Sequence, residues 1–468
     1  MNPSKNLWVF LLFSLLFALN TKTHVSSWND ASRMATIQSI VEDRSFAIDQ
    51  SIFIGTGDKY YYNGHFFSDK PPLLAIFAVP VYFILHSFGF SFESHPGLVY
   101  YLITLITIGL LSALGLSFFR RILIRFFKVE ETWADFVTLV CGTATLVFVY
   151  SIVFNNHMAS GALILIGFYY LLEFIKGGGT KNIVISALVL TLAGSIDFTC
   201  FLFPVAVGIL FMRKSWKAGL IFGASSFPVF FLYLFFNHYT SGSILPPPLN
   251  LELWDYPGSQ FDSQNLSGLS GHDSLKDLGL YALQMILGDR GLISLSPILV
   301  FAITGLVIFF NKYRSFEYRI EYALLVLVSL LFILSYIFRS TNYSGWAFGV
   351  RWYASVIPIL CLSISFVRNW FIKFVFNRVV FIFIMGISIL LSLAGSYSPF
   401  APGIDFNYIT GNAIPYPGIM GFQLIISKTP MIWKIKTLIT AGIIAFIFVV
   451  LIRRSIKEGR LDSVSNKA

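Results

Sequence analysis

The chain has 468 residues, of which 56% are hydrophobic and only 12% are charged, and its net charge is +10. A soluble domain carries about 25% charged residues, so most of this surface must face lipid instead of water. The basic residues fall in short clusters between apolar runs, which is typical of topology signals and argues against a nucleic-acid partner. Composition therefore indicates an all-α polytopic membrane protein.

Twelve apolar runs are predicted to form transmembrane helices, within a membrane domain over residues 1–452. A spanning helix needs about 20 predominantly apolar residues. The first run resembles a signal peptide, but no small-residue cleavage site follows it, so we expect a retained anchor. The predicted spans lie near residues 6–24, 97–119, 132–151, 157–175, 182–196, 198–212, 217–238, 291–310, 320–338, 353–367, 379–395 and 434–452.

The distribution of basic residues predicts which side of the membrane each loop faces. A cytoplasmic N-terminus puts most of the 33 Lys and Arg residues on short cytoplasmic connections and on a basic tail over residues 453–468. The positive-inside rule favours this orientation. The long loops over residues 25–96, 239–290 and 396–433 then lie outside, and long polar loops are usually functional. We expect an inner (plasma) membrane protein whose active face is periplasmic or extracellular.

Residues 71–90 are apolar enough to span the membrane, but we predict that they form a helix in the outer interface. If they spanned, the loop with Arg120, Arg121 and Arg125 would move outside, against the charge rule. Pro71 and Pro72 suit the first turn of such a helix.

The first outer loop carries two charged residues three positions apart, Asp30 and Arg33, just after the first span. On a helix they share one face. Asn29 or Asp30 suits the N-cap of that helix. Spacing alone also allows a purely structural pair, in which Asp30 caps the helix and Arg33 is its salt-bridge partner.

Later in the same loop, Asn63-Gly64 predicts a tight turn. Asp69 and Lys70 then precede the interfacial helix, at the depth of the lipid headgroups. A lysine at this depth can bind a lipid phosphate as a point charge, or it can serve as a general interface anchor.

These residues resemble motifs of the GT-C superfamily of membrane glycosyltransferases, especially its protein mannosyltransferase and aminoarabinose transferase group. The matching elements are Asp30, Arg33 and Asp69-Lys70-Pro71. Supporting elements are the segments 154–157 (FNNH), 288–292 (GDRGL) and 342–352 (NYSGWAFGVRW). Many members of the group have Asp-Glu where this chain has Asp30-Ala31.

The resemblance implies a sugar donor carried on polyprenyl or dolichyl phosphate and attacked by an acceptor hydroxyl, with inversion. Asp30 is then the expected base. The cations expected to stabilise the departing phosphate are Arg33, Lys70, Arg290 and Arg351. The residues expected to contact sugar or acceptor are Asp69, Asn156, His157, Tyr343 and Trp346. No cofactor is certain and a divalent metal stays open; the acceptor is a lipid, a glycan or a protein, and membrane lipid is a further partner.

Structural alternatives remain for several of these residues. Arg351 could pair with Asp69 or Asp289, and His157 could be a hydrogen-bonded boundary residue. Trp346 could belong to the interfacial aromatic belt, as could Tyr60, Tyr61, Tyr62 and Trp352.

Two other functional classes share the predicted topology. One is a secondary transporter or flippase of lipid-linked sugars, but transporters place ionisable groups near the bilayer midplane, and the centres of these spans are nearly free of charge. The other is an oligosaccharide ligase or polymerase, which also uses outer loops and lipid carriers.

Overall fold

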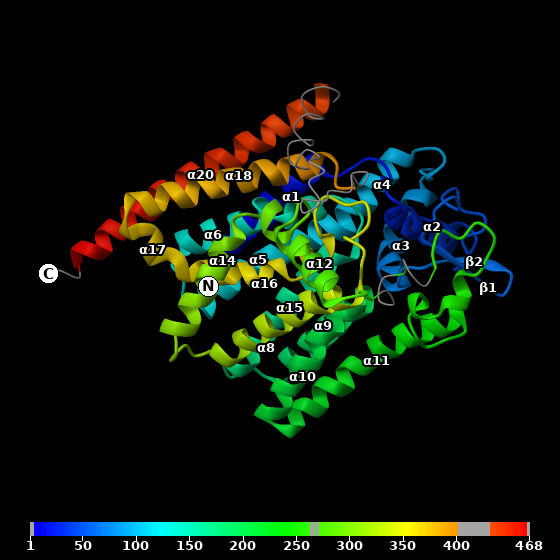
Figure 1. Cartoon of the computed structure of the whole chain (residues 1–468), viewed down its shortest axis with the longest axis horizontal. Coiled ribbons are helices and arrows are strands. Elements are labelled where there is room, and N and C mark those ends of the chain that lie inside the picture. The colour runs from blue at the N-terminus through cyan, green and yellow to red at the C-terminus, as the bar shows by residue number, and fades with distance from the viewer. Residues whose placement is uncertain (1–3, 263–265, 267–270, 401–430, 466–468) are drawn as a thin grey trace.

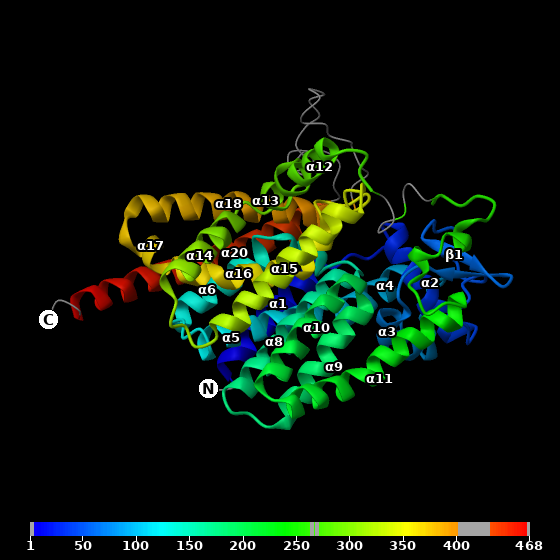
Figure 2. The same ribbon diagram turned by 60° about the horizontal axis from the view of Figure 1, so that its bottom comes forward.

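The computed structural model describes residues 4–262, 266, 271–400 and 431–465, and helices make up nearly all of its regular structure. The long helices form a bundle, and α2, α3 and a β-hairpin lie together at one end of the molecule (Figures 1 and 2). The predicted all-α class is confirmed. Most of the predicted loop 396–433, and the last three residues of the predicted tail, lie outside the described ranges.

Helices are labelled α, strands β and 3₁₀ segments η; η1 is a π-helical turn. The first half of the chain, to Ser241, contains the following elements. The elements are α1 (Ser4–Asn20), α2 (Trp28–Glu42), β1 (Lys59–Tyr62), β2 (His65–Ser68), α3 (Pro72–Ser87), α4 (Pro96–Thr104), η1 (Leu105–Gly109), α5 (Leu110–Arg125), α6 (Glu131–Thr143), α7 (Leu146–Tyr150), α8 (Asn156–Ile175), α9 (Thr180–Ile196), η2 (Phe198–Phe201), α10 (Leu202–Lys214) and α11 (Trp216–Ser241).

The remaining elements are η3 (Pro247–Leu249), η4 (Leu251–Trp254), α12 (Leu275–Leu287), α13 (Leu292–Leu295), α14 (Leu299–Lys312), α15 (Arg319–Arg339), η5 (Arg351–Ser355), α16 (Ile357–Cys361), η6 (Leu362–Val367), α17 (Arg368–Lys373), α18 (Val375–Tyr397) and α20 (Met431–Ser465).

All twelve predicted spans fall on helical segments, but fewer form long helices. In the described ranges, six helices are long and apolar enough to cross a membrane. The segments Leu275–Leu295 and Leu299–Lys312, which meet at a bend of 97°, would make a seventh span if they cross together. The other predicted spans are short or broken. For example, Thr145 lies between α6 and α7 and is the N-cap of α7, and 3₁₀ segments flank α16. A multi-pass membrane protein is confirmed, while the twelve spans are not twelve continuous helices.

Helix α8 lies inside the bundle, where it packs against α5, α9 and α16. In α8, 72% of the most apolar 18-residue stretch is buried. The corresponding share is 17% in α11, which lies at the edge of the bundle (Figure 1). The start of α8 is therefore surrounded by protein, while α11 is left largely open to the membrane.

The predicted elements of the first loop are present as helices and a hairpin. Asn63 and Gly64 both have positive φ, 48° and 86°, as a two-residue hairpin turn requires, which confirms the predicted turn. Helix α3 begins at Pro72, as predicted, and packs against α2. Gly242 ends α11 in the left-handed conformation and lies against Tyr62 of β1, so α11 reaches the hairpin.

One local prediction needs correction. The N-cap of α2 is Ser27, instead of Asn29 or Asp30, and Asp30 is the third helical residue of a capping box with Ser27. At the other end of the chain, α20 extends beyond Ile452 and continues as a helix through the basic tail to Ser465.

Candidate active site

Asp30 is held in place by a complete set of hydrogen bonds. Its carboxylate accepts from the backbone N–H groups of Ser26 (3.0 Å), Ser27 (2.7 Å) and Ala31 (3.2 Å), and from the hydroxyls of Ser27 (2.7 Å) and Tyr100 (2.8 Å). A carboxylate offers about four lone-pair sites, so these five donors occupy both oxygens. Burial raises the pKa of Asp30, while these hydrogen bonds lower it. The arrangement anchors the start of α2.

Arg33 points away from Asp30 and forms no ion pair with it among the described residues. Its Nη1 donates to the carbonyl of Asn29 at 2.9 Å and also to the Asn29 side chain, and its Nη2 donates to Oδ1 of Asn156 at 2.7 Å. Its Nε is buried without a hydrogen-bond partner, and the residue is only 2% exposed. The structural alternative of an Asp30–Arg33 salt bridge is therefore wrong, and Arg33 links α2 to the first residue of α8.

Lys70 lies between two carboxylates at the base of the hairpin. Its Nζ is 2.7 Å from Oδ2 of Asp69 and 2.8 Å from Oδ2 of Asp58. Backbone pairing of Lys59 with Ser68 places Asp58 opposite Asp69, one step beyond the strands. Two acids share one lysine, so Lys70 is already neutralised and is not an unpaired cation available for a phosphate.

Asp69 keeps one oxygen without a partner. Its Oδ2 binds Lys70, but its Oδ1 is buried with no hydrogen bond within the described part of the chain. Burial raises the pKa of Asp69 to about 6, with Asp58 raising it further and Lys70 and Arg33 lowering it. A buried carboxylate with an open oxygen and a pKa near neutrality has the properties of a general base.

Arg33 and Arg351 bring two positive charges to the same region. Burial lowers the pKa of Arg33 to about 10; Asp69 acts against this decrease, whereas Arg351 adds to it. Arg351 lies over the ring of Phe400, 5.6 Å from its centroid, and its Nε is also buried without a partner. Among the described residues, neither guanidinium forms an ion pair with a carboxylate, so the predicted pairs of Arg351 with Asp69 or Asp289 are not formed.

Arg290 lies next to the segment that carries Arg351. Its guanidinium donates to the carbonyl of Gly345 at 2.9 Å, and its own carbonyl accepts from the N–H of Val350 at 3.1 Å. The two segments singled out by their sequence, 288–292 and 342–352, are thus joined by one hydrogen bond from the Arg290 side chain and one to its backbone carbonyl.

His157 is paired, not solitary. Its Nδ1 lies 2.8 Å from Oδ2 of Asp197, which follows α9, and the same oxygen accepts from the hydroxyl of Ser355 at 3.2 Å. Both members of the pair are buried, at 4% exposure each. Asn156 connects this pair to Arg33, because its Nδ2 lies 3.5 Å from Nδ1 of His157. A continuous polar chain therefore runs from Asp197 to Arg33.

Two of the predicted sugar-binding residues lie elsewhere. The Tyr343 ring packs on Tyr281, with centroids 4.9 Å apart, and its hydroxyl donates to Gln284 of α12. The Trp346 side chain is 70% exposed. The structure brings together Asp69, Lys70, Arg33, Asn156, His157 and Arg351, whereas Tyr343 contacts Tyr281 and Gln284.

No metal site is apparent where the residues are described: no group of three or more His, Cys, Asp or Glu side chains could hold an ion. Asp58 and Asp69 are only two ligands, and the ammonium group of Lys70 already occupies the space between them. These residues do not fit a bound divalent cation.

Two residues of the site were missed at the sequence level, Asp58 and Asp197. The signal for Asp58 was present, because a two-residue turn at Asn63-Gly64 fixes a register that puts Asp58 opposite Asp69. Asp197 had no such signal, because its partner His157 is 40 residues away on a neighbouring helix.

No model of a protein family and no curated protein sequence matches this chain. Solved structures similar to it include ArnT from Cupriavidus metallidurans, bound to undecaprenyl phosphate, with 12% identity and a TM-score of 0.49 over 96% of this chain and 77% of that one. They also include the apo oligosaccharyltransferase of Archaeoglobus fulgidus, with 11% identity and a TM-score of 0.48 over 92% of this chain and 59% of that one. With sequence identities of 12% and 11% and TM-scores below 0.5, these similarities assign neither a reaction nor a substrate to the present chain.

Proposed function

We propose that the protein is an integral-membrane glycosyltransferase that moves a sugar from a polyprenyl-phosphate donor to an acceptor hydroxyl on the outer face of the inner membrane. The proposal rests on one arrangement. Among the described residues, the guanidiniums of Arg33 and Arg351 have no carboxylate partner, and they lie near the buried carboxylate of Asp69, which has one oxygen without a hydrogen bond. The motifs around these residues support the same reading.

The two guanidiniums suit a phosphate. Burying a cation without a counter-ion is costly, as for Arg33, and the nearby positive charge of the half-buried Arg351 adds repulsion. The phosphodiester of the donor, with its two free oxygens near Arg33 and Arg351, would supply the missing acceptors, in a geometry that guanidiniums favour. Negative charge grows on this phosphate as the sugar leaves, so the same contacts stabilise the transition state more than the ground state.

Asp69 is the better-placed base. The acceptor hydroxyl forms a bond to the anomeric carbon, the bond from that carbon to the phosphate oxygen breaks, and the hydroxyl proton passes to a carboxylate. Asp69 can accept it at Oδ1, which has no other partner. Asp30, the base that the motif predicts, would first have to lose one of its five hydrogen bonds. We therefore assign the base to Asp69 and the anchoring of α2 to Asp30.

Lys70 and Asp58 act through Asp69 in this scheme. Lys70 stabilises the ionised form of Asp69, and Asp58 opposes it, so the pair adjusts the pH at which the base is active. This differs from a direct contact between Lys70 and the donor phosphate, which would require Lys70 to leave both acids.

One observation favours a second candidate, a proton-coupled transporter or flippase of lipid-linked sugars. His157 and Asp197 form a buried ionisable pair at the start of α8, and such pairs recur in proton pathways of transporters. Flux of a lipid-linked sugar across liposomes containing the purified protein, without any transfer product, would support this reading over the first.

The test of the proposed enzyme is a comparison of envelope glycans and lipids by mass spectrometry. The strains are a deletion strain, the same strain carrying the wild-type gene, and the same strain carrying Asp69→Asn. We expect one sugar residue of defined mass to be missing after deletion and restored only by the wild type. Identical glycans and lipids in all strains would contradict the proposal.

A further inference from the structure

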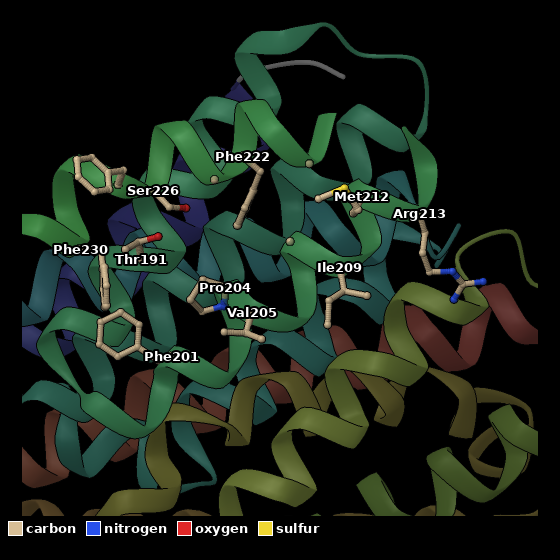
Figure 3. Close-up of a pocket in the computed structure, with 14 residues that line it drawn as sticks. Thr191, Phe201, Pro204, Val205, Ile209, Met212, Arg213, Phe222, Ser226 and Phe230 are labelled. Carbon is tan, nitrogen blue, oxygen red and sulfur yellow. The ribbon is translucent and has the colours of Figure 1, made fainter. Parts of the chain in front are cut away.

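A long apolar groove lies between α10 and α11, far along the chain from the residues of the candidate site. It has a volume of about 530 Å³ and is lined mainly by Phe, Val, Ile, Pro and Gly (Figure 3). Thr191 of α9 contributes to its inner wall. Pockets that hold small ligands have volumes of about 300–1,000 Å³, so the groove is large enough for one.

The length of the groove matches one membrane leaflet. Along this wall its lining residues run from Phe201, the last residue of η2, to Arg213 of α10, which at about 1.5 Å per residue is roughly 18 Å. The hydrocarbon core of a bilayer is about 30 Å thick, so one acyl chain covers about half of that. A single acyl chain therefore fits along the groove.

Glycines keep the groove open on both walls. Gly208 of α10 lies against the ring of Phe222, where an added Cβ would come within 3.3 Å. Gly223 of α11 also lines the groove, and a Cβ there would meet nothing within 4 Å. A large side chain at Gly223 would consequently occupy the groove without a clash against the protein.

One end of the groove is basic. Arg213 lines it, and Figure 3 shows its guanidinium beyond the apolar residues. Lys214 and Lys217 follow at the turn into α11, and all three side chains are exposed. Glu321 at the start of α15 lies near Arg213 and Lys214, with Glu317 close to it, so three basic residues face two acidic ones and the end stays positively charged. Trp216, 63% exposed at the same turn, suits the membrane interface.

We propose that this groove binds one acyl chain of an anionic phospholipid, whose phosphate lies at Arg213. The charge at the mouth and the apolar wall behind it complement the two parts of such a lipid. The lipid would cover α11, the least buried of the candidate spans, whose far end contacts Tyr62 of the hairpin that carries Asp58 and Asp69. The site does not depend on the proposed glycosyltransferase activity.

The test is native mass spectrometry of the full-length protein in detergent, titrated with phosphatidylglycerol or with phosphatidylcholine. We expect the wild type to retain phosphatidylglycerol preferentially. Gly223→Leu should weaken that retention by about tenfold, the equivalent of displacing about two buried methylene groups. Arg213→Gln should remove the preference for phosphatidylglycerol but leave weak binding of both lipids.

Gly442→Leu on α20 is the matched control, because a Cβ at Gly442 also meets nothing within 4 Å, and it should behave as the wild type. Equal retention by Gly223→Leu and the wild type would overturn the proposal. The proposal would also be overturned if the protein were a dimer that Gly223→Leu dissociates and Gly442→Leu does not, because the groove would then be an interface between two copies of the chain. Displacement of phosphatidylglycerol by undecaprenyl phosphate in the wild type and in Arg213→Gln alike would overturn it as well, since the groove would then hold the carrier tail.

Discussion

Asp58 and Asp69 face each other at the base of the first-loop hairpin, and both contact the Nζ of Lys70, at 2.8 Å and 2.7 Å. Only Asp69 also has a buried oxygen without a partner among the described residues. We therefore propose Asp69 as the base and Asp58 as a residue that adjusts its pKa. The proposed base then lies at the hairpin, instead of at Asp30 in the first turn of α2.

Asp69→Asn should reduce the turnover of sugar transfer by about 10²–10⁴-fold, the usual contribution of a general base. The thermal unfolding temperature should change little, because the asparagine keeps the size of the side chain. Turnover with saturating donor and unfolding by differential scanning fluorimetry measure the two effects. Full turnover in Asp69→Asn would remove it from the reaction.

Asp30→Asn should act on stability instead. The amide replaces one acceptor oxygen with a donor that faces N–H and O–H groups, and leaving a buried donor unsatisfied costs about 1–3 kcal/mol. We expect a lower unfolding temperature and turnover reduced in proportion to the folded fraction. A variant that unfolds like the wild type yet has no turnover would return the role of base to Asp30.

The pH dependence of turnover should report the environment of Asp69. A base works when ionised, and burial raises the pKa of Asp69 to about 6, so turnover should rise with pH through about 6. Lys70 lowers this pKa and Asp58 raises it. Lys70→Met should therefore move the acidic limb of the profile to higher pH, and Asp58→Asn should move it to lower pH. Shifts in the same direction for both variants would contradict the assignment.

Arg33→Gln and Arg351→Gln should each raise the KM for the donor. A hydrogen bond to a charged group contributes about 1.5–3 kcal/mol, which corresponds to roughly tenfold to a hundredfold per arginine. Arg339→Gln is the matched control, because Arg339 is exposed at the end of α15. An equal increase in KM for the control would show that the arginines act only through general surface charge.

Asp197→Asn should loosen Arg33 through His157 and Asn156. We expect turnover to fall by about tenfold, while binding of donor phosphate changes less, because Arg33 remains present but is less firmly oriented. Comparing kcat with KM separates the two effects. If Asp197→Asn abolished binding and left kcat unchanged, Asp197 would not be a positioning residue.

Much of the layout followed from the sequence, because it depends on local patterns. Apolar runs predicted the helices, Asn63-Gly64 predicted the hairpin, and Pro71-Pro72 predicted the start of α3. Continuous spans were harder to predict, since a cap such as Thr145 breaks a helix without interrupting its apolar character.

The candidate site was predicted in part. The motifs named Arg33, Lys70, Asn156 and Arg351 as residues of one site, but they did not name the side chains that these residues contact. The hydrogen bonds that saturate Asp30 come from Ser26, Ser27, Ala31 and Tyr100, and the last lies 70 residues away in sequence. The local donors depend on the capping box at Ser27, and Tyr100 depends on tertiary packing, so the spacing of the motif did not distinguish Asp69 from Asp30.

The most direct test of the central claim is equilibrium binding of undecaprenyl phosphate and of undecaprenol, which has the same tail without the phosphate, to the purified protein. We predict that the wild type binds the phosphate more tightly than the alcohol, and that the double variant Arg33→Gln/Arg351→Gln binds both equally weakly. Equal binding of the two lipids by the wild type, or an undiminished preference in the double variant, would contradict a phosphate site at these arginines.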